Sequence, residues 1–236
     1  MILDEVDSTN AEAARRARDY AGPLWILAQR QVAGRGRRGR AWTDPPGNFS
    51  ATLLLRPGVP AEALALRSFA AALALYDALV SVTGRAEGLA LKWPNDVLLN
   101  GGKLAGILLE TTGQSGTCLA IGIGVNLRSA PAPEDGALRP VSLLSETGMN
   151  VTPGELLDQL APAYAQWDAQ LSVHGFAPLR TEWLMRAARL GQPVTARTMR
   201  ATHAGTFEGL DHNGALLLRT AQGPLAIPAA EVFFPD

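Results

Sequence analysis

Four short apolar runs follow one another between residues 89 and 127, with too little chain between them for a helix. Pro94 separates LALKW from DVLLN, and the turn signal NGG at 100–102 leads into KLAGILLETT and then TCLAIGIGVNL. Parallel strands need a connection of a dozen or more residues, so we expect these runs to pair antiparallel through hairpins. This block favours an α+β fold over a doubly wound parallel sheet, in which strands and helices alternate.

Helical patterns lie outside that block, where helix formers and apolar residues stand between start and stop signals. They cover residues 8–20, 60–84, 153–172 and 176–189. Two further apolar runs, at 24–31 and 48–57, read as strands. We therefore expect an α+β fold with a mixed or antiparallel sheet flanked by helices.

The pattern changes after residue 189. Four short strand-like runs follow, separated by the turn signals DHNG and AQG. They resemble a small barrel of about 45 residues, too small to be comfortably stable alone and expected to dock on the main domain. We divide the chain into a domain of residues 1–189 and a small C-terminal domain of residues 190–236.

Composition excludes several classes of protein. The chain is 47% hydrophobic and 18% charged, so it can bury a core and is not disordered. Its net charge of -1 argues against a dedicated nucleic-acid binder. Cys118 is the only cysteine, which excludes an internal disulfide and a cysteine-based zinc site. The N-terminus lacks a signal-peptide pattern and the apolar stretch 68–82 is too short to span a bilayer, so we expect a cytosolic protein without a membrane segment.

The segment GRGRRGR at 34–40 combines four arginines with three glycines. It matches the G-x-G-x-x-G pattern of dinucleotide-binding loops, but such a loop must open a helix, and Pro45 and Pro46 prevent one here. A solvated charged loop is the simplest alternative. We favour an anion-binding loop that is mobile when empty, because glycine backbone N–H groups and arginine side chains can converge on carboxylate or phosphate.

Two residues flank this loop. Trp42 could stack on a purine or act as a cover over the core. Gln31 carries an amide that can pair with a polar heterocycle. Both are candidates for contacts with a ligand that the loop holds.

Lys92 and Lys103 are the only lysines in the chain, and both lie in KWPNDVLLNGGK. If Gly101 and Gly102 form the hairpin turn, residue 98 faces 105 and residue 96 faces 107, which places Asp96 and Lys103 on one sheet face. The pair could be a weak surface ion pair. Alternatively, Lys103 holds a carboxylate and a developing phosphate charge, while Asp96 organises a cation or that lysine.

Glycines within the strands mark places of close approach. Gly106 would let a ligand approach the sheet, and Gly122 and Gly124 lie on one side of the run IGIGVN. Such glycines indicate that another backbone or a flat apolar ligand packs closely there. Asn126 ends this strand and could reach a nucleotide or cap a turn.

Five motifs stand together in the order and spacing seen in biotin–protein ligases: DSTN, QVAGRGRRGRAW, KWPNDV, KLAGILLE and GIGVNL. From about residue 4 onward the chain resembles that family. The resemblance implies a class II synthetase-like α+β catalytic domain and a small C-terminal SH3-like β-barrel. It also implies a reaction in which biotin and ATP, with Mg²⁺, give biotinyl-5′-AMP and pyrophosphate. A lysine of a biotin carboxyl carrier protein domain then attacks this mixed anhydride.

The resemblance assigns roles at the matching positions. The implied catalytic residues are Lys103, Arg37 and Asp96. The implied biotin-binding residues are Ser8, Thr9, Asn10, Gln31, Gly34, Arg35, Gly36, Arg37, Lys103, Gly106, Gly122 and Gly124. The implied nucleotide-binding residues are Arg37, Arg40, Trp42, Lys92, Asn95, Lys103 and Asn126. The ligands of Mg²⁺ stay unassigned.

Two other functions compete with this one. A lipoate–protein ligase uses the same adenylation chemistry, but the combination of GRGRRGR, KWPND and KLAGIL favours biotin. An RNA-binding protein could use the arginine–glycine loop, but the near-neutral charge argues against it. Because DSTN begins at Asp7, we expect a monofunctional form without a helix-turn-helix domain and without specific DNA binding. Related enzymes include monomers and dimers, so a homodimer stays open.

Overall fold

The main body of the protein is a seven-stranded sheet with the strand order β1-β2-β3-β7-β6-β5-β4. The computed structural model describes residues 1–20, 22–113, 118–133 and 137–235. β1 pairs parallel with β2 and the other neighbouring strands pair antiparallel, so the expected mixed sheet is confirmed. The strands are β1 Ile2–Leu3, β2 Leu24–Ala28, β3 Phe49–Leu55, β4 Leu89–Lys92, β5 Asp96–Leu99, β6 Gly102–Thr112 and β7 Cys118–Val125.

The hairpin between β5 and β6 turns one residue earlier than the sequence suggested. Asn100 and Gly101 have φ values of 50° and 77°, which are the positive values that a two-residue hairpin turn needs. Leu98 therefore faces Lys103, and a bulge then shifts the register so that Asp96 faces Gly106. The expected pairing of residue 96 with 107 was wrong.

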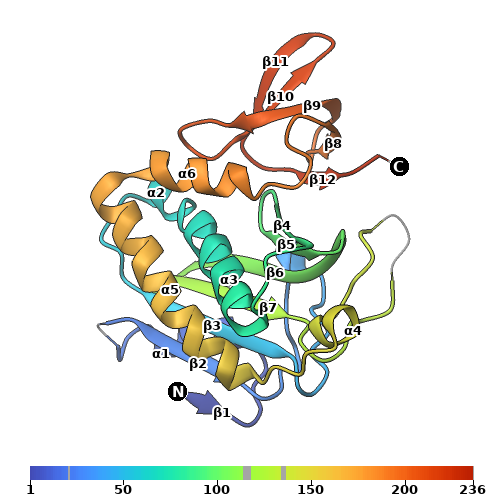
Figure 1. Cartoon of the computed structure of the whole chain (residues 1–236). Helices are drawn as coiled ribbons and strands as arrows, with labels where there is room; N and C mark the ends of the chain where they lie inside the picture. The colour runs from blue at the N-terminus through green and yellow to red at the C-terminus, as the bar shows by residue number, and fades with distance from the viewer. Residues whose placement is uncertain (21, 114–117, 134–136, 236) are drawn as a thin grey trace.

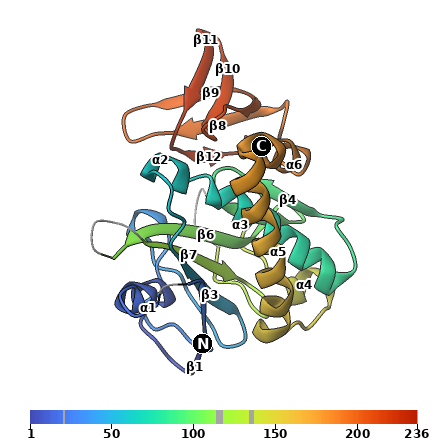
Figure 2. The same cartoon turned by 90° about the vertical axis from the view of Figure 1, so that its left-hand side faces the viewer.

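Helices cover both faces of this sheet (Figures 1 and 2). The long helices α3 (Arg67–Thr83) and α5 (Pro153–His174) pack on one face, and α1 (Thr9–Arg16) lies on the other. β7 shows why the two faces differ. Its alternate residues Ile121, Ile123 and Val125 enter the core beneath α3 and α5, while the residues between them face the side of α1.

The helix expected over 60–84 is two helices, α2 (Ala61–Leu64) and α3. The last helix, α6 (Phe176–Met185), is also shorter than the expected 176–189. A short helix that the sequence pattern did not reveal, α4 (Leu143–Thr147), begins with a capping box at Ser142. These differences concern ends and short segments, where local signals are weakest.

The C-terminal strands form a five-stranded antiparallel sheet in the order β11-β10-β9-β8-β12. It lies above β4 and α6 in Figure 1. In the described part of the chain the edge strands β11 and β12 are not paired with each other, so the expected small barrel is present as a sheet that does not close. The strands are β8 Pro193–Arg197, β9 Thr202–Leu210, β10 Leu216–Thr220, β11 Gly223–Ile227 and β12 Glu231–Phe233.

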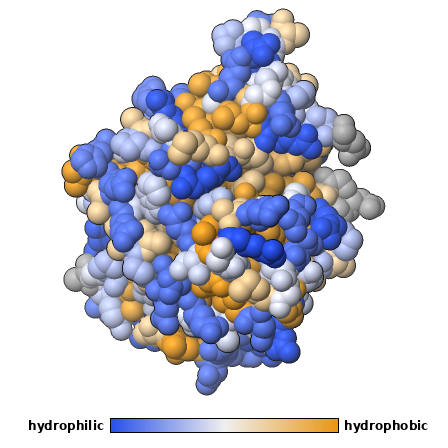
Figure 3. Space-filling view, in the orientation of Figure 1, coloured by the Kyte–Doolittle hydropathy of each residue, from blue (hydrophilic) through white to orange (hydrophobic). Residues whose placement is uncertain are grey.

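Apolar side chains that stay exposed are scattered over the surface. Blue hydrophilic residues are spread over the face seen in Figure 3, with small orange areas between them. The largest exposures belong to Ile2, Val173, Met185 and Met199, which come from separate elements or loops. No helix within the described ranges is long and apolar enough to cross a membrane.

Candidate functional site

A cavity of about 260 Å³ lies on the side of the sheet that carries α1. Its walls come from the start of α1, the arginine–glycine loop (residues 34–40), strands β4 to β7, the segment after β7, and β12. The glycines of β7 face this cavity because they alternate with the core residues of the same strand. Chain segments far apart in sequence therefore meet around one hollow.

Almost every residue assigned from the motifs lines this cavity. The lining includes Ser8, Thr9, Asn10, Gln31, Arg35, Gly36, Arg37, Arg40, Trp42, Lys92, Asn95, Asp96, Lys103, Gly106, Gly122, Gly124 and Asn126. Gly34 is the exception. Its carbonyl accepts a hydrogen bond from the Trp42 N–H at 2.9 Å, and a Cβ on Gly34 would meet the Trp42 carbonyl at 2.8 Å. Gly34 therefore lies where the two ends of the loop meet, which we call its neck, and its lack of a side chain lets the backbone at Trp42 approach closely.

One end of the cavity is neutral and polar. The backbone N–H and the hydroxyl of Thr9 lie 2.8 and 3.0 Å from Oε1 of Gln31. The Thr52 hydroxyl on β3 lies 2.8 Å from the Thr9 hydroxyl and 2.6 Å from Oδ1 of Asn10. Ser8 begins α1 as its N-cap residue but makes no side-chain capping bond. This end offers hydroxyl and amide groups suited to a neutral polar ring.

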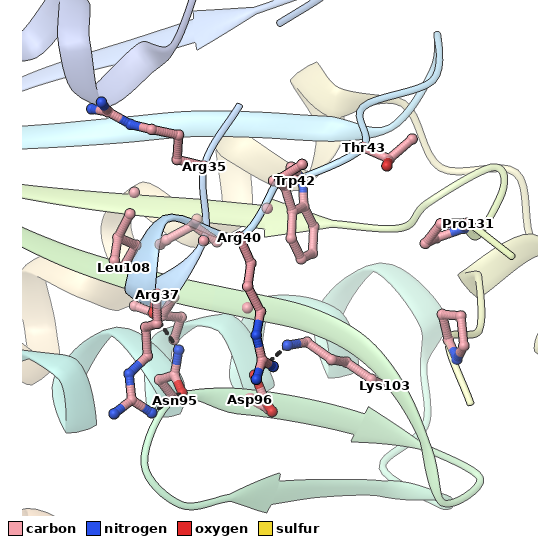
Figure 4. Close-up of a pocket in the computed structure, with 18 of the residues that line it drawn as sticks. Arg35, Arg37, Arg40, Trp42, Thr43, Asn95, Asp96, Lys103, Leu108 and Pro131 are labelled. Atoms are coloured by element: carbon pink, nitrogen blue, oxygen red, sulfur yellow. Dashed lines mark hydrogen bonds and ion pairs between the residues drawn. The ribbon is translucent and has the colours of Figure 1, made fainter. Parts of the chain in front are cut away.

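The other end of the cavity is cationic. Nζ of Lys103 lies 2.8 Å from one carboxylate oxygen of Asp96, and Nζ of Lys92 lies 3.5 Å from the other. Figure 4 shows Lys103 pointing toward Asp96. Burial raises the pKa of Asp96, but the two lysines outweigh it, so the pKa lies below its ordinary value. The expectation that Asp96 and Lys103 share a face is thus confirmed, although the register that suggested it was wrong.

The four arginines of the loop differ in their partners. Arg38 and Arg40 reach Glu231 of β12, at 3.4 and 2.7 Å, and Arg35 lies 3.9 Å from Glu110. Arg37 instead donates to two neutral oxygens. One belongs to the side chain of Asn95, which lies beside Arg37 in Figure 4, at 3.2 Å, and the other is the Ala230 carbonyl at 3.4 Å.

Arg37 is therefore the loop arginine without a carboxylate partner within the described residues. Burial lowers its pKa, because a cation loses water there. A half-buried guanidinium held by neutral acceptors attracts an anion strongly. All four arginines of the loop line the cavity, but Arg35, Arg38 and Arg40 are also tied to Glu110 or Glu231, whereas Arg37 is held by neutral oxygens.

Trp42 lies over the two cross-strand glycines Gly106 and Gly124. A Cβ at Gly124 would overlap the indole ring, whereas one at Gly106 would contact it at an ordinary 3.4 Å. Nζ of Lys103 lies 6.0 Å from the indole centroid, within range of a cation–π contact. Of the glycines expected to admit a backbone or a ligand, Gly106 and Gly124 thus admit an aromatic side chain, and Gly122 admits the Asn10 amide.

Replacing Gly124 by alanine is expected to displace Trp42 and to lower the free energy of unfolding by about 1–3 kcal/mol. Gly106→Ala is the matched control, because it faces Gly124 in the register and meets the same ring without overlap. Without ligand, Gly106→Ala should change the free energy of unfolding by no more than about 0.5 kcal/mol. Thermal melts of both proteins provide the test, and equal destabilisation would contradict this account of the packing.

Asn126 is buried at the end of β7, and its side-chain Nδ2 donates to the Val141 carbonyl at 3.1 Å. Its Oδ1 is buried and has no hydrogen-bond partner among the described residues. A buried acceptor left unpaired costs about 1–3 kcal/mol. Since Asn126 lines the cavity, a ligand that donates a hydrogen there would remove this cost.

Several residues with contacts to the site were not singled out in the sequence. Thr52, Glu110, Ala230 and Glu231 contact motif residues from strands or turns far away in the chain. Thr52 had a local signal, as a polar residue inside the apolar run FSATLLL. Glu231 had none, because nothing near it in sequence predicts two arginine partners from the loop.

Comparison with known proteins places these features in context. The model of the biotin/lipoate A/B protein ligase family matches residues 3–127, and that of the biotin protein ligase C terminal domain matches residues 190–234. The chain is 58% identical over 238 residues to the biotin–[acetyl-CoA-carboxylase] ligase of Paracoccus denitrificans, covering 99% of each chain. It is 31% identical to the bifunctional ligase/repressor BirA of Escherichia coli, covering 92% of this chain and 68% of that protein.

The fold also has close relatives among solved structures. One is the biotin protein ligase from Aquifex aeolicus in complex with biotin and ATP. It matches with a TM-score of 0.85 and 27% identity, covering 98% of this chain and 96% of the other. The similarity extends over both sheets, because nearly the whole of each chain is covered.

Proposed function

Because this chain belongs to the biotin/lipoate A/B protein ligase family, we propose that it activates biotin with ATP and transfers the biotinyl group to a carboxylase. The matches to the family models and to the Paracoccus denitrificans ligase confirm the resemblance that the five motifs indicated. The observation that supports this function best is the two-ended cavity, which joins a neutral polar end to a cationic end. Biotin has two ends that complement these, a neutral ureido ring for the polar end and a carboxylate on its tail for the cationic end.

The reaction has two steps. A carboxylate oxygen of biotin attacks the α-phosphorus of ATP, and the bond to pyrophosphate breaks, giving biotinyl-5′-AMP. The amine of a lysine on the carrier domain then attacks the carbonyl carbon, AMP leaves, and the nitrogen loses a proton. The first step brings two anions together, so it needs positive charge to offset their repulsion.

The neutral end is proposed to hold the ureido ring. Ser8, Thr9 and Gln31 present hydroxyl and amide groups toward the cavity. Asn10 lies behind them, its amide filling the space that Gly122 leaves. A ring with two N–H donors and one carbonyl acceptor suits such a mixed set of partners.

The cationic end is proposed to stabilise the charge that develops during adenylation. Lys103 is one-third exposed and Asp96 fixes its position, so its ammonium can contact both the biotin carboxylate and the α-phosphate. Arg37 adds a second cation with no acidic partner among the described residues. Burial lowers the pKa of Lys92, and Asp96 opposes this shift, which fits a supporting role deeper in the same cluster.

The nucleotide is proposed to lie between Trp42 and Asn126. Oδ1 of Asn126, which has no partner within the described ranges, is an acceptor for an exocyclic amino group such as that of adenine. Trp42 offers an aromatic face, and Arg40 and Asn95 lie on the side of the phosphates.

Mg²⁺ is proposed to enter with the phosphates of ATP. Within the described residues, no three side chains of the His, Cys, Asp or Glu type gather as a metal cluster. The acids of the cavity lining, Asp96 and Glu231, already hold basic partners. Mg²⁺ commonly keeps waters and binds substrate phosphates with few protein ligands, so the residues present fit such an ion and do not form a cage for it. It would reduce the charge on the phosphates.

The arginine–glycine loop is proposed to order over the ligands, because its glycines are flexible and its arginines repel one another. Amide hydrogens of residues 34–40 should exchange more slowly once biotin and ATP are bound. Hydrogen exchange followed by mass spectrometry measures this directly, with the peptides of β9 as an internal control. Unchanged exchange in the loop would contradict its role as a lid.

We propose the division into a catalytic domain of residues 1–189 and a second unit of residues 190–236. The second unit has its own sheet and supports the loop through Glu231 and Ala230. The absence of specific DNA binding, a cytosolic location and the choice between monomer and homodimer stay predictions. Gel shifts, cell fractionation and light scattering test them in turn.

A transfer assay tests the function as a whole. The full chain is incubated with ATP, Mg²⁺, biotin and a carboxylase carrier domain, and the mass of the carrier is measured. The carrier should gain one biotinyl group, and omitting ATP or replacing biotin by lipoate should prevent the gain. A carrier modified equally well with lipoate, or not modified at all, would contradict the proposed function.

A further inference from the structure

Glu110 lies near the end of β6, outside the lining of the cavity, with a side chain that is 40% exposed. One of its carboxylate oxygens accepts a hydrogen bond of 2.7 Å from Nδ2 of Asn10. The other lies 3.9 Å from Arg35 of the loop. The Glu110 carboxylate therefore lies against both Asn10 and Arg35, two residues that line the cavity, although Glu110 does not line it.

The contact with Glu110 determines which way the Asn10 amide points. A carboxylate only accepts hydrogen bonds, so the NH₂ group of Asn10 must face it and the carbonyl Oδ1 must face Thr52. The amide has little freedom to move away, because it fills the space above Gly122, where any Cβ would overlap it. Asn10 is also buried, so water cannot replace the lost partner easily.

The orientation of the Asn10 amide also determines which partner receives the hydrogen of the Thr52 hydroxyl. The Thr52 hydroxyl has one hydrogen, and Oδ1 of Asn10, at 2.6 Å, takes it. Thr52 then offers only lone pairs to Thr9, and the single hydrogen of the Thr9 hydroxyl goes either to Thr52 or to Oε1 of Gln31. Gln31 turns its Oε1 toward Thr9 because the Thr9 backbone N–H donates to it at 2.8 Å, and its Nε2 lies beside Gly34 at the neck of the loop.

We propose that Glu110 is a positioning residue that sets the donor and acceptor pattern of the neutral end of the cavity, and so its affinity for the ureido ring. This inference rests on the proposed function, since it assigns the ring to that end. Glu110 acts through Asn10, Thr52 and Thr9 rather than by contact with biotin. Its role is in recognition of biotin, because the reacting atoms lie at the cationic end.

Steady-state kinetics of three variants test this proposal. Glu110→Ala removes the acceptor, and the KM for biotin should rise about tenfold or more, with kcat and the KM for ATP within about twofold of wild type. Glu110→Gln keeps an acceptor oxygen of the same reach and should restore the KM for biotin to within about threefold. Glu208→Ala is the matched control, because Glu208 is a strand residue of 43% exposure that pairs with Arg219 away from the cavity.

Several results would overturn the proposal. An unchanged KM for biotin in Glu110→Ala would do so, as would a fall in kcat with no change in KM. Equal defects in the Gln and Ala variants would show that charge near Arg35 matters, and not the acceptor. A similar rise in Glu208→Ala would indicate a general loss of stability, which melting curves of all variants measure separately. If the wild-type chain does not use biotin at all, it is the proposed function that fails.

Discussion

Replacing Lys103 by alanine is expected to slow the formation of biotinyl-5′-AMP by a factor of about 100 to 1,000, the usual cost of losing one hydrogen-bond donor that stabilises a transition state. The Lys103 ammonium is held at the cationic end of the cavity by Asp96, 2.8 Å away. Pyrophosphate release in the presence of biotin and ATP measures this step without a carrier domain.

The fold should survive this change. Lys92 still faces the second oxygen of Asp96, so we expect the free energy of unfolding to fall by about 1–3 kcal/mol. Arg219→Ala is the control for loss of a cation, since Arg219 is exposed on β10 and pairs with Glu208. Pyrophosphate release near the wild-type rate in Lys103→Ala would refute the role of this lysine.

Replacing Arg37 by alanine is expected to raise the dissociation constant for biotinyl-5′-AMP about 10- to 100-fold. Charge-assisted hydrogen bonds contribute about 1.5–3 kcal/mol, and each 1.4 kcal/mol corresponds to a factor of ten. Arg37 has only neutral acceptors among the described residues, so its charge is available to the adenylate. Calorimetric titration with a non-hydrolysable analogue of the adenylate measures the effect.

Arg38→Ala is the matched control for this prediction. Arg38 is the neighbouring residue, carries the same charge and points to Glu231 at 3.4 Å. Its loss should change the dissociation constant by less than about threefold, because an exposed ion pair contributes little. Equal effects of both replacements would mean that the total charge of the loop matters, and not the position of Arg37.

The strand pattern of residues 89–127 was predictable because hairpins are local. Apolar runs with short turns between them leave antiparallel pairing as the simple solution. The register was not predictable to the residue, since NGG allows the turn at Asn100–Gly101 or one residue later. The tertiary structure decides where the turn lies. Gly102 packs against the Val141 side chain, and the backbone N–H of Lys103 donates to the Arg139 carbonyl.

The missed elements share a physical cause. β1 and β12 are two and three residues long, and such short strands exist only because a neighbouring strand pairs with them. The break between α2 and α3 also has no Gly or Pro inside the run to announce it. Local propensity is too weak to decide such segments when packing opposes it.

By itself the sequence determined the residue types of the site: the glycines, the arginine loop, both lysines and the DSTN stretch lie within short motifs whose chemistry is local. Only the tertiary structure decided how these groups are oriented and paired. Arg37 differs from Arg38 because Glu231, from the far end of the chain, pairs with one and not the other. Asn10 points as it does because Thr52 and Glu110 hold its two ends. Such pairings depend on distances between segments remote in sequence, which no local pattern specifies.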